Sequence, residues 1–514
     1  MRDKNELTRL KLNFWREMPE TTFSYRLKQA MSESDLKQVD LVRMASEQGQ
    51  KLGKSQVSQY LSGRTVPRAG LMAFLASALG VSEDWLSGAE PEQAPTSTTA
   101  QATHERGTGM RTFNKSSKLD NVLYDVRGPV VDEANRMEED GTQVLKLNIG
   151  NPAPFGFRTP DEVVYDMRNQ LTDCEGYSAS KGLFSARKAI MQYDQIKGLP
   201  NVGMNDIYTG NGVSELINLC MSALLDSGDE ILIPSPDYPL WTACATLAGG
   251  VAVHYACDEA ADWNPDLDDI RAKVSPRTKA IVIINPNNPT GAVYPRDVLE
   301  GIVRIARENQ LMIFSDEIYD RLCMDDVKHV SIASLAPDLF CVTFNGLSKS
   351  HMIAGFRIGW MSLSGNKRAA RDYIDGLNML SNMRICSNVP AQAIVQTALG
   401  GYQSVNDYIV PGGRVYDQRE FVYQALCDIP GISVVKPKAA FYTFPKLDVK
   451  KFNITDDVQF AVDLLKEKHI LVVQGSGFNW AEPDHFRIVY LPRIPVLREA
   501  MTKLGDFLAT YQQA

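Results

Sequence analysis

The chain has 514 residues, enough for two or more domains with a sizeable buried core. Hydrophobic residues make up 44% of it and charged residues 23%, and the formal net charge of −8 argues against a chain that binds nucleic acid over its whole surface. No apolar run of about 18 residues is present, so we expect no transmembrane helix and no membrane partner.

The eight cysteines show neither the spacing of a metal site nor that of a disulfide framework. Several lie in apolar runs, which predicts reduced and mostly buried thiols. Residues 1–6 are charged and lack the apolar stretch that follows in a signal peptide. We therefore expect a cytoplasmic protein without a metal site. The cysteines are Cys174, Cys220, Cys244, Cys257, Cys323, Cys341, Cys386 and Cys427.

The predicted elements begin with a series of short helices. Apolar residues recur at helical spacing, and Gly63 and Gly80 end two of the periodic stretches. Five short helices within roughly 70 residues predict a compact all-α domain. The helical stretches are 23–31, 37–45, 54–63, 69–79 and a last turn at 84–86.

Residues 23–88 resemble the Cro/repressor-type helix-turn-helix family, through the runs 38–42, 55–63 and 78–86 and through Pro67. In that family the third helix lies in the major groove of double-stranded DNA. The resemblance implies a DNA-binding domain at 20–90. Its DNA contacts would be Gln38, Lys54, Ser55 and Gln59.

The alternative for these helices is a small bundle that contacts other proteins. Residues 1–90 hold 13 basic and 11 acidic side chains, so their charge favours DNA only slightly. The following stretch, 91–117, is rich in Thr, Ala, Gln, Gly and Pro and offers almost nothing to bury, which predicts a flexible linker.

From residue 118 onward, helical stretches alternate with short β-branched runs. This alternation predicts an α/β fold with a mostly parallel sheet and helices on both faces, followed by a smaller α+β part. The predicted strands are 144–149, 206–209, 230–234, 251–255, 280–284, 311–315 and 339–344, then 432–435, 440–444, 470–474 and 485–489.

Residues suited to binding and chemistry follow the ends of these strands, where ligands bind in open α/β sheets. A glycine turn at 209–212 opens a helix and suits a phosphate, although many such turns are only turns. Tyr238 offers an aromatic face or packs in the core. Asn288 lies in a rigid Asn-Pro turn, and Asp316 is costly to bury without a cationic partner.

Lys349 follows the run 339–344 after a turn of small residues, with Gly355 and Arg357 shortly behind it. A lysine held in a pocket beside other charges can lose its proton and form a Schiff base. Arg357 would then share a phosphate with backbone amides. A lysine on a surface loop is the alternative for this residue alone.

Together these stretches resemble the fold-type I, pyridoxal-phosphate-dependent aminotransferases, and most closely the bacterial glutamate–pyruvate (alanine) transaminases. The resemblance covers 118–512 and rests on the runs 117–122, 147–157, 284–293 and 390–403. It implies a catalytic domain at 118–514. The large domain would span about 165–400, and the small domain 118–164 and 401–514.

The resemblance also implies roles for individual residues. The catalytic residues would be Lys349, Asp316 and Tyr319. Lys349 would bind pyridoxal 5′-phosphate and move a proton between substrate and cofactor. Asp316 would pair with the ring nitrogen, and Tyr238 would stack on the ring. Asn288 and Tyr319 would bond its phenolic oxygen.

The phosphate of the cofactor would be held by Val213, Ser214, Ser348 and Arg357. Tyr177 would reach the phosphate of the neighbouring subunit, which makes a homodimer with shared active sites necessary for activity.

Substrate binding is the third implied role. Arg487 would clamp the substrate α-carboxylate, since an arginine fork fits a carboxylate bidentately, and Gly150 and Asn288 would lie beside it. Phe155 and Phe157 would narrow the side-chain pocket in favour of a small group such as methyl.

The expected function is transamination, L-alanine plus 2-oxoglutarate to pyruvate plus L-glutamate, with an appended DNA-binding module. Valine, aspartate and 2-aminobutyrate stay open as amino donors. The alternative is a transcription regulator whose aminotransferase-like domain senses cofactor or an amino acid. A sensor does not need substrate turnover, so the complete catalytic set favours the enzyme.

Overall fold

The computed structural model describes residues 22–34, 36–47, 50, 52–87, 114–119, 122, 124 and 128–513. The chain divides into two compact units, Met1–Phe113 and Asn114–Ala514. Most of the predicted linker 91–117 lies outside the described residues.

The described part of the first unit is a bundle of five helices, as the periodicity predicted. Its core contains Leu27, Leu41, Val57 and Leu75, all fully buried. Gly80 ends one of the helices in the left-handed conformation, with φ of 66°, which glycine adopts without the strain of a side chain. The helices are α2 (Phe23–Glu33), α3 (Gln38–Glu47), α4 (Lys54–Leu61), α5 (Ala69–Leu79) and α6 (Glu83–Ser87).

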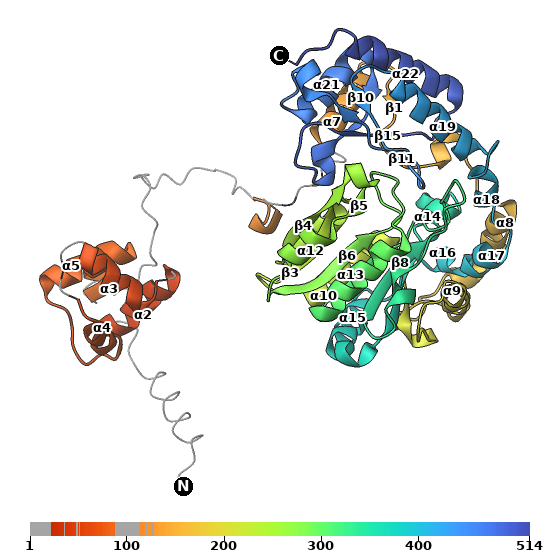
Figure 1. The fold of residues 1–514 in the computed structure, drawn as a ribbon. Helices are drawn as coiled ribbons and strands as arrows, with labels where there is room; N and C mark the ends of the chain where they lie inside the picture. Colours follow the sequence, from red (N-terminus) through yellow and green to blue (C-terminus); the bar gives the residue numbers. More distant parts are fainter. Residues whose placement is uncertain are drawn as a thin grey trace. The chain divides into compact units, whose positions relative to one another are not determined.

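The second unit is built on an eight-stranded sheet with the order β2-β9-β8-β7-β6-β3-β4-β5 (Figure 1). The central strands β4, β3, β6, β7 and β8 pair in parallel, whereas β9 pairs antiparallel with both β8 and β2. The strands are β2 (Ile207–Gly210), β3 (Glu230–Ser235), β4 (Val251–Asp258), β5 (Asn264–Pro265), β6 (Thr278–Ile284), β7 (Met312–Asp316), β8 (Phe340–Gly346) and β9 (Gly359–Gly365).

Helices cover both faces of this sheet. In β6, Ile281 and Ile283 pack with Ile302 on one face, whereas Val282 and Ile284 pack with Ile217 on the other. The apolar run in β6 is therefore buried on both faces, and the sequence shows such strands as β-branched runs.

The helices of the second unit are α7 (Pro129–Glu139), α8 (Asp161–Gln170), α9 (Phe184–Ile196), α10 (Val213–Leu224), α11 (Leu240–Leu247), α12 (Leu267–Lys273), α13 (Arg296–Glu308), α14 (Leu347–Ser350), α15 (Arg371–Met383), α16 (Val389–Ala393), α17 (Val395–Gly400), α18 (Val405–Tyr408), α19 (Arg414–Cys427), α20 (Val449–Phe452), α21 (Asp457–Lys468) and α22 (Ile494–Leu508). None of the described helices is long and apolar enough to cross a membrane.

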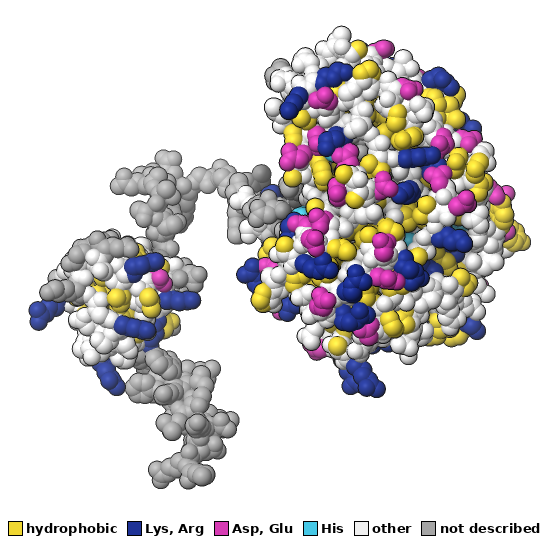
Figure 2. Space-filling view, in the orientation of Figure 1, with side chains coloured by type: hydrophobic (Ala, Val, Ile, Leu, Met, Phe, Trp, Pro, Cys, Tyr) yellow, Lys and Arg dark blue, Asp and Glu magenta, His cyan; other side chains and the backbone are white. Residues whose placement is uncertain are grey.

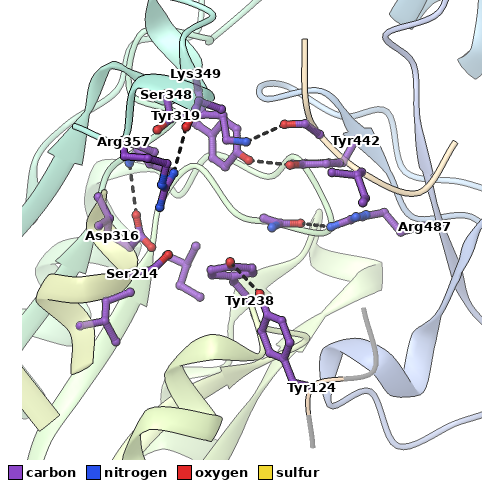
Figure 3. A pocket seen from close by; sticks show the side chains of 18 residues that line it. Tyr124, Ser214, Tyr238, Asp316, Tyr319, Ser348, Lys349, Arg357, Tyr442 and Arg487 are labelled. Carbon is purple, nitrogen blue, oxygen red and sulfur yellow. Dashed lines mark hydrogen bonds between the residues drawn. The ribbon is translucent and has the colours of Figure 1, made fainter. Parts of the chain in front are cut away.

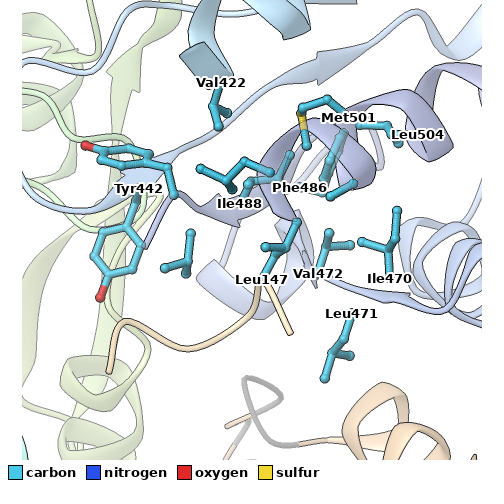
Figure 4. Close-up of a cluster of buried hydrophobic side chains, with 14 of the residues drawn as sticks. Leu147, Val422, Tyr442, Ile470, Leu471, Val472, Phe486, Ile488, Met501 and Leu504 are labelled. Carbon is cyan, nitrogen blue, oxygen red and sulfur yellow. The ribbon is translucent and has the colours of Figure 1, made fainter. Parts of the chain in front are cut away.

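A second hydrophobic core surrounds the C-terminal strands (Figure 4). The parallel pair β1–β13 joins Leu145 to Ile470, so residues early in this unit pack with residues late in it. Leu147, Phe486 and Leu504 are among its buried members. The strands here are β1 (Leu145–Lys146), β10 (Ile432–Ser433), β11 (Tyr442–Thr443), β12 (Lys446–Leu447), β13 (Ile470–Leu471), β14 (Val473–Gln474) and β15 (Phe486–Val489).

Candidate active site

A pocket lies at the carboxyl ends of the parallel strands, and most of the predicted site residues line it (Figure 3). Strand β7 ends at Asp316, β8 leads into α14 with Lys349, and β15 of the second core contributes Arg487. The pocket-lining residues that the sequence predicted are Gly150, Val213, Ser214, Tyr238, Asn288, Asp316, Tyr319, Ser348, Lys349, Arg357 and Arg487.

Lys349 reaches into the pocket from the short helix α14. Its Nζ donates a hydrogen bond to the Gly150 carbonyl oxygen at 2.6 Å and lies 6.0 Å from the centre of the Tyr319 ring. No carboxylate among the described residues forms an ion pair with it. The amine therefore faces the pocket, where a backbone carbonyl holds it.

Asp316 is almost fully buried, with two weak hydrogen bonds. Trp241 Nε1 donates to one carboxylate oxygen and the backbone N–H of Ile318 to the other, each at 3.3 Å. Burial raises the pKa of Asp316 to about 6, although both hydrogen bonds act in the opposite direction. A cationic ring nitrogen beside this carboxylate would offset the cost of burying its charge.

The N-terminus of α10 and Arg357 form a cradle for an anion. Gly212, at φ of 82°, turns the chain into the helix, and the free N–H groups of the first turn include those of Val213 and Ser214. Arg357 donates to the carbonyl oxygens of Asn211 at 3.1 Å and Ala354 at 3.0 Å. A helix dipole and a guanidinium converge here, as a phosphate requires.

Glycine is needed beside this cradle because the backbones approach closely. A Cβ placed on Gly359 would lie 2.6 Å from the backbone nitrogen of Val213. A Cβ on Gly150, across the pocket, would collide with the Tyr442 hydroxyl.

Arg487 is a buried cation at the opposite side of the pocket from Arg357, with Lys349 between them (Figure 3). Its Nη1 donates to Asn288 Oδ1 at 2.8 Å and its Nη2 to the carbonyl of Asn148, but its Nε has no hydrogen-bond partner among the described residues. Burial lowers the pKa of the guanidinium. No carboxylate in the described part of the chain pairs with it, so the site lacks one negative charge that a ligand could bring.

Four tyrosine hydroxyls, joined in two pairs, also line the pocket. Tyr319 and Tyr442 share a hydrogen bond of 2.6 Å, and Tyr238 and Tyr124 share one of 3.0 Å. Burial raises the pKa of Tyr238 and of Tyr319 well above the ordinary value, so both rings are neutral at physiological pH.

The sequence did not predict Tyr124 or Tyr442 as site residues, nor the hydrogen bond from Trp241 to Asp316. Tyr124 lies in a stretch without secondary-structure pattern, and Tyr442 lies in a predicted strand whose residues read as core. Trp241 follows the aromatic run after β3, which was a signal for an aromatic face but not for a donor to Asp316.

Two groups of predicted residues lie outside the pocket. Tyr177 is 83% exposed and does not reach the pocket of its own chain. Phe157 is buried in the second core beneath Tyr408 and Arg414, and neither it nor Phe155 lines the pocket.

The predicted DNA contacts are brought together on the first unit. Lys54, Ser55 and Gln59 are exposed on α4, whose Val57 and Tyr60 are buried in the bundle. Gln38 opens α3 and is partly exposed.

The Aminotransferase class I and II profile matches residues 142–504. The chain is 59% identical to the glutamate-pyruvate aminotransferase AlaA of Escherichia coli K12 over 404 residues, which is 79% of this chain and all of the relative. It is 52% identical to the alanine aminotransferase of Mycobacterium tuberculosis H37Rv over 413 residues, 80% of this chain and 96% of that protein.

Solved structures are similar in fold as well. A crystal structure of an aminotransferase from Escherichia coli superposes with a TM-score of 0.78 at 59% identity, covering 79% of this chain and 100% of the other. The alanine aminotransferase of Pyrococcus furiosus gives 0.74 at 38% identity, covering 77% of this chain and 100% of that one.

Proposed function

Since this chain belongs to the class I and II aminotransferases, an enzyme family that depends on pyridoxal 5′-phosphate, we propose that it transfers the amino group of L-alanine to 2-oxoglutarate. The products are pyruvate and L-glutamate. The observation that carries the proposal is the arrangement of Arg357, Lys349 and Arg487, which offers two anion sites with an amine between them.

The residues of the pocket fit the cofactor. The cradle at α10 and Arg357 suits a phosphate, and the buried carboxylate of Asp316 calls for a cation such as a protonated ring nitrogen. Ser348, Val213 and Ser214 would complete the phosphate contacts, and Tyr238 would cover the ring. When bound, the cofactor supplies an electron-withdrawing ring that takes up the charge left by a departing proton.

The chain's own groups then position the substrate and move that proton. Arg487 binds the α-carboxylate through its fork, which brings the α-carbon of the amino acid toward Lys349. Lys349 Nζ takes the proton from that carbon as a general base. Asp316 would supply the negative charge that pairs with the ring nitrogen of the cofactor, and Asn288 and Tyr319 would bond the oxygen substituent of the ring.

A small side chain is favoured for the amino donor. The space beside Gly150 is closed by the Tyr442 hydroxyl, and the tyrosine pair Tyr124–Tyr238 borders the same pocket. The relatives named alanine aminotransferase support alanine as the donor of this chain.

We also propose a homodimer with Tyr177 completing the phosphate site of the neighbouring subunit. The support is a set of apolar side chains that are exposed to solvent on the second unit. Such exposure is unfavourable unless a partner covers these side chains. Tyr177, Phe184, Met379 and Met383 are 83%, 65%, 64% and 73% exposed.

A visible absorption spectrum of the purified protein tests the reaction. L-alanine should discharge the absorption band of the bound cofactor, and pyruvate should restore it, whereas Lys349→Ala should show neither change. A protein that binds the cofactor but responds to no common amino acid would instead be the regulator that the sequence left as the alternative. The relatives, all aminotransferases by name, do not favour that alternative.

The first unit is proposed to bind double-stranded DNA. Figure 2 shows a group of Lys and Arg side chains on the displayed face of this unit, with Asp and Glu far fewer. The support on α4 is that Lys54, Ser55 and Gln59 are exposed there, and α4 would be the recognition helix in this proposal.

A selection of bound duplexes from a random-sequence pool tests this module with the full chain. We expect one DNA sequence to be enriched. Gln59→Ala should abolish this enrichment, and Glu83→Ala should leave it intact. If both variants instead retain random duplex equally, and only at low salt, the DNA proposal fails and the bundle is a module that contacts other proteins.

A further inference from the structure

The residues from the end of β7 to Asp320 form two groups with different surroundings. Asp316, Ile318 and Tyr319 line the pocket, but Glu317 and Asp320 do not. The two carboxylates instead contact the ammonium of a single residue. Lys197, which follows α9, places its Nζ 2.5 Å from Glu317 Oε2 and 2.7 Å from Asp320 Oδ2.

This ion-paired group is buried. The side chains of Lys197, Glu317 and Asp320 are 11%, 0% and 4% exposed. Glu317 also accepts hydrogen bonds from the hydroxyls of Ser315 at 2.8 Å and Ser331 at 2.7 Å. Its position is thus fixed from three directions, immediately beside Asp316.

Asp320 extends the group to the strand that leads to Lys349. Its Oδ2 also accepts from Asn345 Nδ2 at 2.7 Å, and Asn345 Oδ1 accepts from the backbone N–H of Gly346 at 2.7 Å. Gly346 is the residue before α14, so a continuous path of polar contacts joins Lys197 to the helix that carries Lys349.

Lys197 and Asp320 stay charged at neutral pH. Burial opposes the charge of Lys197, but Asp320 and Glu317 outweigh it and raise the pKa of the ammonium well above its ordinary value. Burial likewise opposes the charge of Asp320, but Lys197 prevails and lowers the pKa of that carboxyl. Burial lowers the pKa of neighbouring His329, which stays neutral.

Glu317, Asp320 and His329 lie close enough together to hold a metal ion. The Lys197 ammonium, at ion-pair distance from both carboxylates, already takes the place of that cation. The ion-paired group therefore holds the segment after β7 in a fixed position beside the pocket.

We propose that Lys197 is a positioning residue of the transamination. It touches neither substrate nor cofactor. Its ammonium holds Glu317 and Asp320. These carboxylates in turn keep the pocket residues Asp316, Tyr319 and Lys349 in fixed positions relative to one another. A buried ion pair adds little to stability compared with apolar packing, but it demands one geometry, and catalysis gains from such fixed geometry. This inference rests on the proposed transamination.

The test compares Lys197→Met, Lys197→Arg and Asp320→Asn in the full-length holoenzyme. Asp320→Asn is included because Lys197→Met leaves two buried carboxylates without their cation, whereas Asp320→Asn keeps Lys197 beside Glu317. In folded variants we expect kcat to fall roughly 10- to 100-fold, and cofactor to dissociate more readily by about tenfold. The KM for L-alanine should change less than about twofold, because Arg487 is not part of the group. Lys197→Arg should restore part of kcat.

Lys367→Met is the matched control, because Lys367 forms a half-buried ion pair with Asp206 at 2.6 Å and does not line the pocket. It should lower the melting temperature and leave kcat and cofactor affinity unchanged. If the Asp320→Asn protein folds and has the kcat and cofactor affinity of the parent, the ion-paired group of Lys197, Glu317 and Asp320 has only a structural role, and the proposal is overturned. If the parent turns over no amino acid, the proposed function fails, and the cofactor affinity of the same variants still decides the role of Lys197.

Discussion

Asn288 and Arg487 are joined by a hydrogen bond of 2.8 Å, from the guanidinium to the amide oxygen. Asn288 comes from the rigid turn after β6 and Arg487 from β15, so one bond connects the sheet with the second core at the point where both meet the pocket. Because the oxygen of the Asn288 amide accepts this bond, its NH2 group is the part that can donate to a ligand in the pocket. Both residues line the pocket, so this contact would join the proposed substrate site to the proposed cofactor site.

Replacing Arg487 tests the carboxylate site. Arg487→Gln removes the buried charge, and kcat/KM for L-alanine should fall at least roughly 30-fold, in line with a loss of about 2 kcal/mol or more for a desolvated charge pair. Arg487→Lys should recover little, because an ammonium cannot bind a carboxylate through two parallel hydrogen bonds. Steady-state kinetics measures both. Arg307→Gln, which removes an exposed arginine paired with Asp338, is the control and should leave kcat/KM unchanged.

Replacing Asp316 should separate stability from function. Its pKa of about 6 in the folded chain lies above the ordinary carboxyl value because of burial, so ionisation costs stability, and this cost grows as the pH rises from about 4 to above 6. The cofactor-free Asp316→Asn protein should gain up to about 3 kcal/mol in unfolding free energy at pH 8 relative to the parent, and less at pH 4.5. Chemical denaturation at both pH values measures the difference.

The same Asp316→Asn protein should hold the cofactor more weakly than the parent, because the ring nitrogen loses its anionic partner. A stability difference that does not vary with pH would contradict the first expectation, and unchanged cofactor affinity would contradict the second.

His485 should make stability depend on pH. Burial opposes its charge, but the hydrogen bond to Asp484 at 2.6 Å and the nearby Glu259 raise its pKa above the ordinary value. Its stabilising contribution is therefore complete below about pH 6.5 and is lost as the pH rises through the raised pKa. Lys446, which pairs with both carboxylates, stays charged over this range.

The expected result is that His485→Gln destabilises the protein more at pH 6 than at pH 9, measured by chemical denaturation. An equal destabilisation at both pH values would assign the effect to lost packing of the ring against Phe444, on which it stacks at 4.8 Å.

Gly150→Ala should damage the pocket without disrupting the fold. The added methyl group would collide with the Tyr442 hydroxyl, which itself is bonded to Tyr319. We expect a cost of about 1–3 kcal/mol in stability and a loss of turnover greater than that of Gly400→Ala, whose added Cβ meets nothing within 4 Å. Thermal melting and kcat measure the two effects, and equal behaviour of the two variants would show that the approach to Tyr442 relaxes freely.

The central sheet was predictable because inner parallel strands such as β3 and β6 are buried on both faces and read as apolar runs. All seven strands predicted ahead of residue 345 are present, with shifts of a few residues at their ends. Strand β9 was not predicted, because it contains Ser362 and Ser364, which look like turn residues. Both are buried, and their hydroxyls bond to Asp194 and to the Cys341 carbonyl, partners that only the folded structure supplies.

The candidate site was predictable where a residue follows a strand end, as Asp316 and Lys349 do. Residues that reach the pocket from elsewhere leave no such pattern. Tyr124 bonds to Tyr238 across 114 positions of sequence, and Lys197 contacts Glu317 from the end of a helix whose sequence shows only ordinary amphipathic character. Tyr177 is exposed in the single chain, and its predicted role can be tested only in the dimer.

The pairing of β1 with β13 has a consequence for synthesis on the ribosome. Leu145 must wait for Ile470 before its strand has a partner, and Arg487 emerges later still. The described helices at the start of the chain pack around a core of their own, so they can fold as soon as they leave the exit tunnel. At ordinary rates of about 5–20 residues per second, the nascent polypeptide therefore carries a finished helical unit for many seconds before its pocket can close.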